Sequence, residues 1–548
     1  MAHVSNADSP ITARIEDGIV YSPLPSFDIP KCSFYAMTRE LVKNAPEKVM
    51  LVDDSHAFTR AECLTQMQRY AAGFQAHGIQ PGDHLCVYLE NSIENYFATF
   101  GCVFAGAVIV LAKTSLTERE LQYQVKEADV VHILTEQKFV QKVKNVDAVT
   151  PFKGLFVIGD AAGFVSTSTF SQWKESEFRE IPVPDPERTL MALAYTSGTT
   201  GLPKPVEITH YNFVASFYTT AKCGTRTDGD VTLAWNQLAH VSGLWSILTA
   251  LAGAVCVVVP HTLGMDRYAD MIDKFKVTLL HGFPGRLEKL VHYVHSTGRR
   301  LNTVQDVGVG GGALSKQLAE LTMSVFENLR SLRLFYGMTE SNGFLCAPPK
   351  DVVSYTDIGY PVLMSEIKVV NVTTGKSLGP NEPGELCYRS PAASRGYYKR
   401  PLETAQFRDS EGWCRSGDLA YHDTDGRVHF VERIKEMIKC LDQQVVPTEL
   451  EELLLAKHGG IAEVAVLGVP HPVYGEAPAA IVVPKEDIKN VAGAMEREIK
   501  DIVAGTCAEY KHLYGGVFFV EALPKTESGK IQRKALFDTW AKCTRLPL

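Results

Sequence analysis

A stretch rich in glycine and hydroxyl side chains, closed by a lysine, spans residues 195–204 with the sequence YTSGTTGLPK. Gly198 and Gly201 allow backbone angles closed to other residues, so successive N–H groups can converge on an anion. The hydroxyls add donors, and Lys204 adds a full positive charge. The composition therefore predicts a phosphate-binding loop, with a flexible surface loop as the alternative. It is not the Walker loop, because no Gly-Lys-Ser/Thr triplet opens a helix here.

A second candidate site lies at the end of the run LRLFYGMTE, residues 332–340. This run finishes with the polar residues Thr339 and Glu340. The apolar part of this run predicts a strand that ends at Thr339 and Glu340. Ligands of open α/β sheets bind at the carboxyl ends of strands. A lone carboxylate at that place suits a hard cation such as Mg²⁺.

Two further motifs carry chemistry less specifically. Residues 308–313, GVGGGA, fit the dinucleotide pattern G-x-G-x-x-A, but a lone match is weak evidence. Near the end of the chain, residues 524–534 read PKTESGKIQRK. Lys530 follows a Ser-Gly turn that can project it, with a basic surface turn as the alternative reading.

Strands alternate with helices in the segments that must position these residues. Short apolar runs at 49–52, 84–89, 130–134 and 155–158 predict strands, and the capping boxes at 59–62 and 117–120 predict helix starts between them. This alternation predicts a parallel α/β sheet. From residue 384 onwards, short strands and turns predict an antiparallel subdomain.

The C-terminal part has an α+β pattern of its own. A capping box at 448–451 predicts a helix over residues 448–455, and apolar runs at 463–467 and 480–483 predict strands. This pattern indicates a second, smaller domain after the antiparallel segment.

Bulk composition indicates a soluble globular protein of more than one domain. The 548 residues are too many for a single core. A net charge of −8 gives no support for a nucleic-acid or anionic-membrane partner. The 12 cysteines form no C-x-x-C pair, which is typical of reduced thiols inside a cell. The apolar stretches 97–112 and 243–259 are interrupted by glycine or hydroxyl residues, so each predicts a buried helix, a turn and a strand instead of a transmembrane segment.

Taken together, the motifs at 195–204, 308–313, 332–340 and 524–534 resemble those of the adenylate-forming enzymes. This superfamily includes acyl-CoA synthetases, 4-coumarate–CoA ligases and beetle luciferases, and the resemblance runs from about Phe34 to about Leu536. It implies an α/β fold: a large N-terminal domain (1–433) with two α/β sheet subdomains and a small antiparallel β subdomain, then a small mobile α+β domain (434–548). It also implies that a carboxylic acid is activated by ATP and Mg²⁺ and then transferred to CoA.

The resemblance also implies roles for individual residues. Residues implied in catalysis are Lys530, Glu340, Thr339, His240 and Lys439, and Glu340 is also the implied Mg²⁺ ligand. Residues implied in nucleotide binding are Thr196, Ser197, Gly198, Thr199, Thr200, Gly201, Lys204, Gly311, Gly312, Ala313, Tyr336, Gly337, Met338, Thr339, Asp418, Arg433 and Lys530. The implied substrate pocket comprises His240, Ser242, Gly310, Ser341 and Asn342. Lys435 is the implied hinge between the two domains.

The chain departs from the family pattern in four places. Pro205 stands where glycine is usual. Because proline fixes φ and has no backbone N–H, the end of the loop should be stiffer and should lack one hydrogen-bond donor. Leu334 replaces a polar residue beside the adenine, which predicts looser selectivity for ATP. Leu441–Asp442 replaces a Lys-Gly pair at the thiol entry, which leaves the thiol step less certain than adenylation. Ser216 replaces an arginine of beetle luciferases.

The alternatives are a luciferase-like monooxygenase, an adenylation domain serving a carrier protein, and an acyl- or nucleotide-binding protein without turnover. We expect a monomer or weak homodimer. No secretory signal is visible at the first residues, and the chain ends in RLPL instead of the peroxisomal Ser-Lys-Leu, so we expect a cytoplasmic protein.

Overall fold

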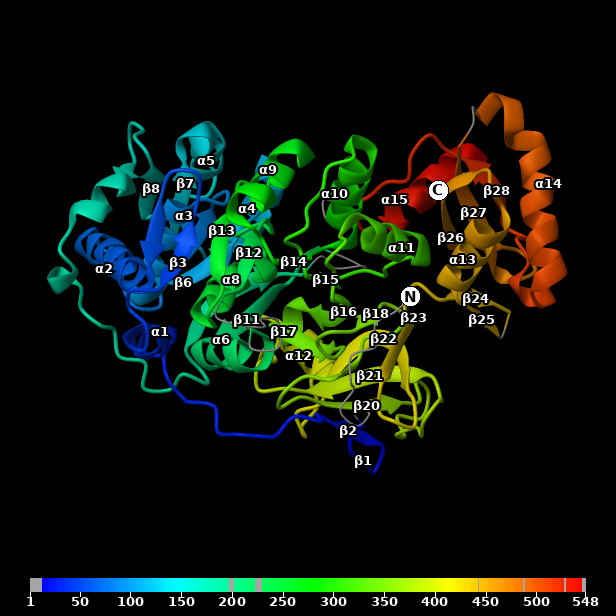
Figure 1. Ribbon diagram of the computed structural model, residues 1–548, viewed down its shortest axis with the longest axis horizontal. Helices are drawn as coiled ribbons and strands as arrows, with labels where there is room; N and C mark the ends of the chain where they lie inside the picture. Colours follow the sequence, from blue (N-terminus) through cyan, green and yellow to red (C-terminus); the bar gives the residue numbers. More distant parts are fainter. Residues whose placement is uncertain are drawn as a thin grey trace.

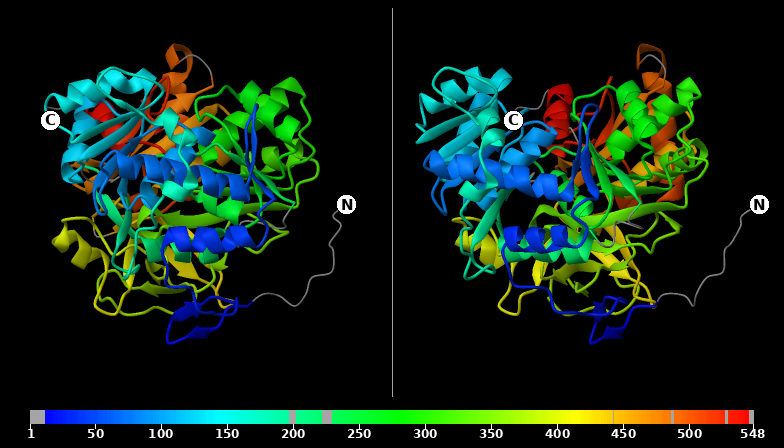
Figure 2. Two further views of the ribbon diagram at one scale, coloured as in Figure 1. Left: turned by 90° about the vertical axis from the view of Figure 1, so that its left-hand side faces the viewer. Right: turned by 60° about the vertical axis from the view of Figure 1, so that its left-hand side comes forward.

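A computed structural model of the chain describes residues 12–196, 202–221, 229–441, 443–485, 488–526 and 529–544. Within these residues the chain forms four β-sheets covered by helices, with the N-terminal half at one end and the last hundred residues at the other (Figure 1). In the turned views the C-terminal part lies behind the two large sheets, at the far end of the long axis of the molecule (Figure 2). The expected α/β architecture is confirmed.

The first sheet is the one that the strand–helix alternation predicted. Its seven strands lie in the order β11-β10-β6-β5-β7-β8-β9, parallel except for β11. The strands are β5 (His84–Tyr88), β6 (Val108–Leu111), β7 (His132–Glu136), β8 (Gly154–Ile158), β9 (Val165–Ser166), β10 (Leu190–Tyr195) and β11 (Pro205–Thr209). The helices of this part are α2 (Arg60–Ala76), α3 (Ile93–Phe104), α4 (Glu118–Glu127) and α5 (Val140–Asp147). Capping boxes at Thr59 and Thr117 start α2 and α4, as predicted.

The second sheet has ten strands, most of them parallel, and it meets the first through shared helices. Its order is β19-β17-β16-β15-β14-β12-β13-β3-β4, with β18 beside β16. The strands are β3 (Val49–Val52), β4 (Ala57–Thr59), β12 (Val231–Ala234), β13 (Val255–Val258), β14 (Leu279–Gly282), β15 (Asp306–Gly310), β16 (Ser331–Met338), β17 (Gly343–Ala347), β18 (Val353–Ser354) and β19 (Tyr360–Pro361). The helices are α1 (Phe34–Lys43), α6 (His210–Ser216), α8 (Val241–Leu251), α9 (Met265–Phe275), α10 (Pro284–Thr297) and α11 (Lys316–Val325).

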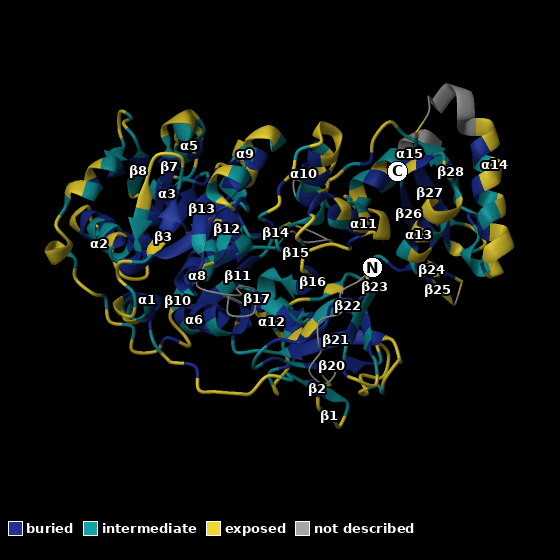
Figure 3. Cartoon of the chain, in the orientation of Figure 1, coloured by how far each residue is buried: buried dark blue, intermediate teal, exposed yellow. Residues whose placement is uncertain are grey.

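One apolar core joins these two sheets. Phe34 of α1 packs against Phe100 of α3 and Phe213 of α6, with ring centroids 5.2 and 5.1 Å apart. The same core includes side chains of both sheets, and Figure 3 shows the central strands buried and the outer helix faces exposed. The stretches 97–112 and 243–259 are the predicted helix–turn–strand units, α3 with β6 and α8 with β13. In the described parts of the chain no helix is both long and apolar enough to cross a membrane.

The third sheet is antiparallel, with the order β1-β2-β20-β21-β22-β23. Its strands are β1 (Ile15–Glu16), β2 (Ile19–Tyr21), β20 (Glu366–Val370), β21 (Gly384–Arg389), β22 (Cys414–His422) and β23 (Val428–Arg433), and α12 (Pro401–Phe407) packs beside them. The pairing of Ile19 with Lys368 adds an N-terminal hairpin to a sheet otherwise built after residue 365. No local pattern indicated this long-range pairing.

The C-terminal part forms the fourth sheet, with β25, β24, β27 and β26 in order and β28 beside β27. Its elements are β24 (Ile438–Cys440), β25 (Gln443–Val445), α13 (Pro447–Lys457), β26 (Ile461–His471), β27 (Gly475–Pro484), α14 (Ile488–Thr506), β28 (Gly516–Phe519) and α15 (Arg533–Thr544). The helix predicted at 448–455 is present, but its predicted capping box is wrong. The helix begins at Pro447 after Val446, because proline is already set for the first helical position and places Thr448 inside the helix.

Candidate functional site

A cavity of about 590 Å³ lies where the ends of several sheets meet the C-terminal domain. Thr196 comes from the end of β10, Gly310 from the end of β15, and Arg433 from the end of β23. Lys530 reaches the same cavity from the turn before α15. The fold thus brings residues from distant parts of the sequence to one place.

Most described residues that the sequence placed in the site line this cavity. They are Thr196, Lys204, His240, Ser242, Gly310, Gly311, Gly337, Met338, Thr339, Glu340, Arg433, Lys435 and Lys530. The predicted residues that the structure describes outside the lining are Gly312, Ala313, Tyr336, Ser341, Asn342, Asp418 and Lys439. The loop residues Ser197, Gly198, Thr199, Thr200 and Gly201 lie outside the described residues.

Two paired strands, β10 and β11, flank the predicted phosphate loop in the sequence. β10 and β11 pair antiparallel up to Tyr195 and Pro205, and the Thr196 N–H donates to the Lys204 carbonyl at 3.1 Å. The Lys204 amine lies 5.1 Å from the centre of the Tyr397 ring, a cation–π distance. The Tyr397 hydroxyl in turn donates to Glu340 Oε1 at 2.8 Å. These contacts tie the exit of the loop to the carboxylate that follows β16.

Glu340 is the only carboxylate among the described residues that line the cavity, against six cationic side chains. Burial raises the pKa of Glu340 above its ordinary value, and the Tyr397 hydroxyl opposes this. No group of three or more candidate metal ligands exists in the described parts of the chain. One carboxylate does fit Mg²⁺ when substrate phosphates and water supply the other oxygens, which is how this cation usually binds. Glu340 is therefore the residue that would hold it.

Asp418 and Tyr336 form a buried pair beside the cavity. The Tyr336 hydroxyl donates to Asp418 Oδ2 at 2.7 Å, and Arg433 Nε lies 3.4 Å from Oδ1. Burial raises the pKa of Asp418 and the charge of Arg433 opposes it. Asp418 itself does not line the cavity, but its neighbours Ser416 and Gly417 do. A role for Asp418 in nucleotide binding stays a prediction.

Lys530 is presented by a tight turn of the C-terminal domain. Its N–H donates to Thr526 Oγ1 at 3.1 Å, and its carbonyl accepts the Thr526 N–H at 2.8 Å. The neighbouring Gly529 has φ +84°, and a Cβ there would lie 2.7 Å from Gly285 Cα at the start of α10. The two domains therefore touch backbone to backbone beside Lys530. Lys439 is exposed on β24, outside the cavity, so this structure presents only one of the two predicted lysines to the site.

The predicted acid pocket around His240 is lined by aromatic rings. His240 caps α8, its Nδ1 accepting the Ser242 N–H at 3.1 Å. Burial, with a smaller effect from Lys113, lowers the pKa of His240 to about 4, so the imidazole is uncharged at neutral pH. Aromatic rings that line the cavity include Phe283, 5.4 Å from the His240 ring, and Trp245, Phe335 and Phe344. The centroid distances are 4.3 Å for Phe335–Phe344 and 5.3 Å for Trp245–Phe344. Sequence analysis missed these rings, because only the fold brings α8 next to β16 and β17.

Ser341 and Asn342 were expected in the substrate pocket, but neither lines the cavity. Ser341 Oγ bonds to the carbonyls of Met338 and Gly343, at 2.8 and 2.6 Å. Asn342 is fully buried with φ +45°, which reverses the chain between Glu340 and β17. Gly312 and Ala313 are exposed beyond the end of β15. Ser341 and Asn342 therefore shape the turn that presents Glu340.

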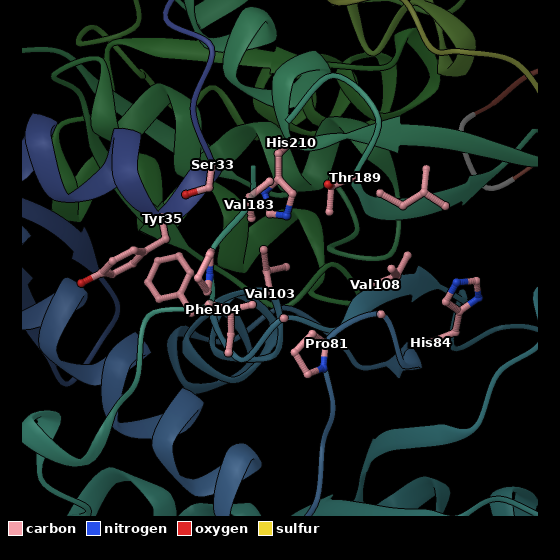
Figure 4. Close-up of a pocket in the computed structure, with 15 residues that line it drawn as sticks. Ser33, Tyr35, Pro81, His84, Val103, Phe104, Val108, Val183, Thr189 and His210 are labelled. Atoms are coloured by element: carbon pink, nitrogen blue, oxygen red, sulfur yellow. The ribbon is translucent and has the colours of Figure 1, made fainter. Parts of the chain in front are cut away.

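A second cavity of about 290 Å³ lies at the opposite end of β10, among residues of α1, α3 and the start of α6 (Figure 4). Its walls are mostly apolar, and His210 and Thr189 are among its polar residues. None of the residues that the sequence placed in the site lines it. The predicted chemistry therefore gathers at one end of β10 only.

The partly buried His240 should make the protein less stable in acid. The folded-state pKa of about 4 lies below the ordinary value of about 6.5, so protons bind preferentially to the unfolded chain as the pH falls from 6.5 to 4. His240→Asn keeps a good capping residue but removes the titrating group. We expect its free energy of unfolding to fall less steeply with decreasing pH than that of the wild type, with a difference in slope of up to about 1.4 kcal/mol per pH unit. Urea titrations from pH 7 to 4 measure this. His295→Asn, on the exposed face of α10, is the control. Equal slopes for His240→Asn and the wild type would contradict it.

Leu441 adopts a conformation that disfavours side chains. It has φ +57° and an exposed side chain, and it opens the tight turn between the paired residues Cys440 and Gln443. A left-handed backbone conformation costs an L-residue about 1–2 kcal/mol, and glycine avoids this cost. Part of the gain is lost because glycine has more conformational entropy in the unfolded chain. We expect Leu441→Gly to raise stability by roughly 0.5–1 kcal/mol. Adenylation should stay unchanged, because Leu441 does not line the cavity. Denaturant titration measures the stability, and a pyrophosphate-exchange assay measures adenylation. A less stable Leu441→Gly variant would show that the backbone at Leu441 is not strained.

Comparisons with known proteins agree with this geometry. Residues 38–398 match the AMP-binding enzyme family, and residues 449–530 match the C-terminal domain of AMP-binding enzymes. The chain is 32% identical over 540 residues to 4-coumarate:CoA ligase 1 of Petunia hybrida, covering 95% of this chain and 96% of the relative. It is also 32% identical over 552 residues to a 4-coumarate–CoA ligase of Vanilla planifolia, covering 96% and 97%.

Solved structures show the same fold at lower identity. The anthranilate CoA ligase AuaEII in complex with anthranoyl-AMP superposes with a TM-score of 0.84 at 23% identity, over 95% of this chain and 99% of that one. ATP-bound MatB from Rhodopseudomonas palustris gives 0.82 at 24% identity, over 93% and 99%. The family match covers well over half of the residues, and the sequence relatives are similar over nearly their whole length. The chain therefore belongs to the AMP-binding enzyme family, the adenylate-forming enzymes that its motifs resembled.

Proposed function

We propose that this protein activates an aromatic carboxylic acid with ATP, releasing pyrophosphate, and transfers the acyl group to the thiol of CoA. As a member of its family it is an AMP-forming acid–thiol ligase that uses ATP and CoA. The observation that carries the proposal is one cavity whose lining combines Lys204, Glu340, Arg433 and Lys530 with aromatic rings.

The first half-reaction joins the carboxylate to the α-phosphorus and displaces pyrophosphate. The carboxylate and the triphosphate are both negatively charged, so negative charge accumulates as they approach, and preorganised cations offset it. Lys204 would bind the outer phosphates, and Lys530 would bridge the carboxylate and the α-phosphate as they meet. Mg²⁺ bound at Glu340 would neutralise phosphate charge. The uncharged His240 would line the place of the reacting carboxylate without adding a charge.

The second half-reaction requires the small domain to turn. Lys435 lies between β23 and β24, in the segment that joins the two domains, and it lines the cavity. We take the domain boundary at residues 433/434 and the hinge at Lys435 as part of the proposal. A rotation there would withdraw Lys530 and bring the face of β24 with Lys439 to the acyl-adenylate. This accounts for two functional lysines on one domain.

The aromatic acid is supported by the rings of Trp245, Phe335 and Phe344 and by the names of the relatives. Flat rings stack or meet edge to face at the distances seen here. Ser216, where beetle luciferases carry an arginine, is fully buried and outside the cavity lining. No observation favours a luciferase-like reaction.

A panel of carboxylic acids in an ATP–pyrophosphate exchange assay tests the proposal. We expect cinnamic and benzoic acids to give higher kcat/KM than hexanoic or decanoic acid, and CoA-dependent AMP release with the best acid. Lys530→Ala serves as the inactive control. Faster exchange with the fatty acids would overturn the aromatic assignment alone, whereas no exchange with any acid would overturn acid activation itself.

A further inference from the structure

The second cavity, at the amino end of β10, has the make-up of a small-molecule site. It measures about 290 Å³, and residues of α1, β5, α3, β6, β10 and α6 enclose it together with the chain segment 181–183. Ligand sites are mostly apolar hollows with a few polar groups that fix the orientation of the ligand. Val103, Phe104 and Val108 are among the apolar residues of this lining, and the ring of His210 is directed toward the middle of the group (Figure 4).

His210 brings an unpaired hydrogen-bond donor to this cavity. The residue is only 5% exposed, and its Nδ1 accepts the Phe34 N–H at 3.3 Å. Burial lowers the pKa of His210 to about 4, so the ring is neutral at neutral pH and its one proton lies on Nε2. Nε2 has no hydrogen-bond partner among the described residues. A buried donor is costly to leave unpaired, so this N–H calls for an acceptor oxygen in the cavity.

The lining of the cavity disfavours a charged ligand. None of the residues that line it is lysine, arginine, aspartate or glutamate. An ion would therefore lose its hydration there without gaining a counter-charge, which is strongly unfavourable. The catalytic cavity differs, because Lys204, Glu340 and Arg433 line it.

The size of the cavity and the rings in its lining favour a ligand with one aromatic ring. An engineered protein cavity of about 150 Å³ holds benzene. The cavity of about 290 Å³ thus has room for a benzene ring with a small substituent. Tyr35 and Phe104 both line it, and their rings meet edge to face with centroids 4.9 Å apart. A ligand ring would extend this arrangement, since aromatic rings prefer such contacts.

We propose that this cavity is a second ligand site, which binds a neutral monocyclic aromatic compound whose carbonyl oxygen accepts the His210 Nε2–H. Pro182 lines the cavity and is exposed to solvent, so the segment 181–183 is the wall through which the ligand would enter. The site goes beyond the proposed ligase reaction and does not depend on it, because the two cavities share no lining residue.

Two probes that differ in the acceptor oxygen test the hydrogen bond. Fluorine NMR measures the dissociation constants of para-fluoroacetophenone, which has a carbonyl group, and para-fluoroethylbenzene, which lacks it. We expect both to bind to the wild type. His210→Asn should shift the ratio of the two affinities about fivefold against the ketone, the effect of one hydrogen bond. The difference in hydration between the probes cancels in this comparison, and the asparagine Oδ1 can still accept the Phe34 N–H.

A bulky side chain in the wall of the cavity tests the location. Val183→Trp should occupy the space and weaken the binding of both probes by about tenfold or more. The matched control is Val149→Trp, which adds the same ring at a residue that is 63% exposed and lines neither cavity. Circular dichroism and thermal midpoints confirm folding, and Val183→Phe replaces the tryptophan variant if that one fails to fold.

Three results would overturn the proposal. Binding that Val183→Trp leaves unchanged would place the probes elsewhere, the catalytic cavity included. An equal effect of His210→Asn on both probes would show that the cavity accepts aromatic rings without the hydrogen bond. If neither probe binds to the folded wild type, water alone satisfies the His210 Nε2–H. A failure of the proposed ligase reaction leaves these outcomes unaffected, because the binding measurements involve no turnover.

Discussion

Replacing Lys530 with alanine is expected to slow adenylate formation by about 100-fold or more, the effect of losing one preorganised charge contact in a transition state. Lys530 lines the cavity beside Arg433 and is presented by a turn that touches α10. Thioester formation from supplied acyl-adenylate should be largely kept, because the proposed rotation takes Lys530 away before the thiol attacks. Single-turnover measurements of each half-reaction test this.

The pH dependence of adenylation offers a second readout for Lys530. Burial lowers the pKa of its amine, the charge of Arg433 adds to this, and Glu436 and Asp418 oppose it. The Lys530 amine should therefore lose its charge at a lower pH than a free lysine does. The rate of adenylation should decline as the pH rises through this range. The matched control is Lys525→Ala on the same turn, whose amine pairs with Glu463 2.5 Å away. An equal loss in both half-reactions would show that Lys530 does not separate them.

Replacing Glu340 with glutamine should reduce adenylation about 100-fold, on the scale of losing one charged contact, and weaken its dependence on Mg²⁺. The amide keeps the shape of the side chain and can still accept from the Tyr397 hydroxyl, which lies 2.8 Å from Glu340 Oε1. It removes the charge that would hold the cation beside the phosphates. Raising Mg²⁺ should partly restore the rate, and affinity for free ATP should change little or improve.

Stability separates this role from a structural one. Burial raises the pKa of Glu340, so the folded state tolerates the charged carboxylate less well than the unfolded chain does. The penalty is absent below the unfolded-state pKa, grows as the pH rises from there to the folded-state pKa, and is complete above it. At pH 7 the glutamine variant should therefore be at least as stable as the wild type. Tyr397→Phe, which keeps the carboxylate, is the control for the magnesium titration. A lower melting temperature for Glu340→Gln with an unchanged magnesium midpoint would remove Glu340 from the metal site.

Local pattern was sufficient for the elements that carry most of the site. Alternating apolar runs and capping boxes at Thr59 and Thr117 predicted the first parallel sheet and its helices, because both signals depend on residues a few positions apart. The glycine and hydroxyl run after β10 and the Thr-Glu pair after β16 also follow from neighbouring residues. The same holds for Lys530 on its turn.

What the sequence alone left open depends on contacts between distant segments. The N-terminal hairpin pairs with β20, about 350 residues away, and the aromatic wall forms only where α8 meets β16 and β17. Ser341 and Asn342 have the right place in a motif, yet the reversal of the chain at Asn342 turns them away from the cavity. Lys113 belongs to no motif that we recognised, yet it lines the cavity. Sequence spacing thus determined which groups could do the chemistry, while the packing of strands and domains decided which of them face one cavity, because burial and register are set by partners hundreds of residues apart.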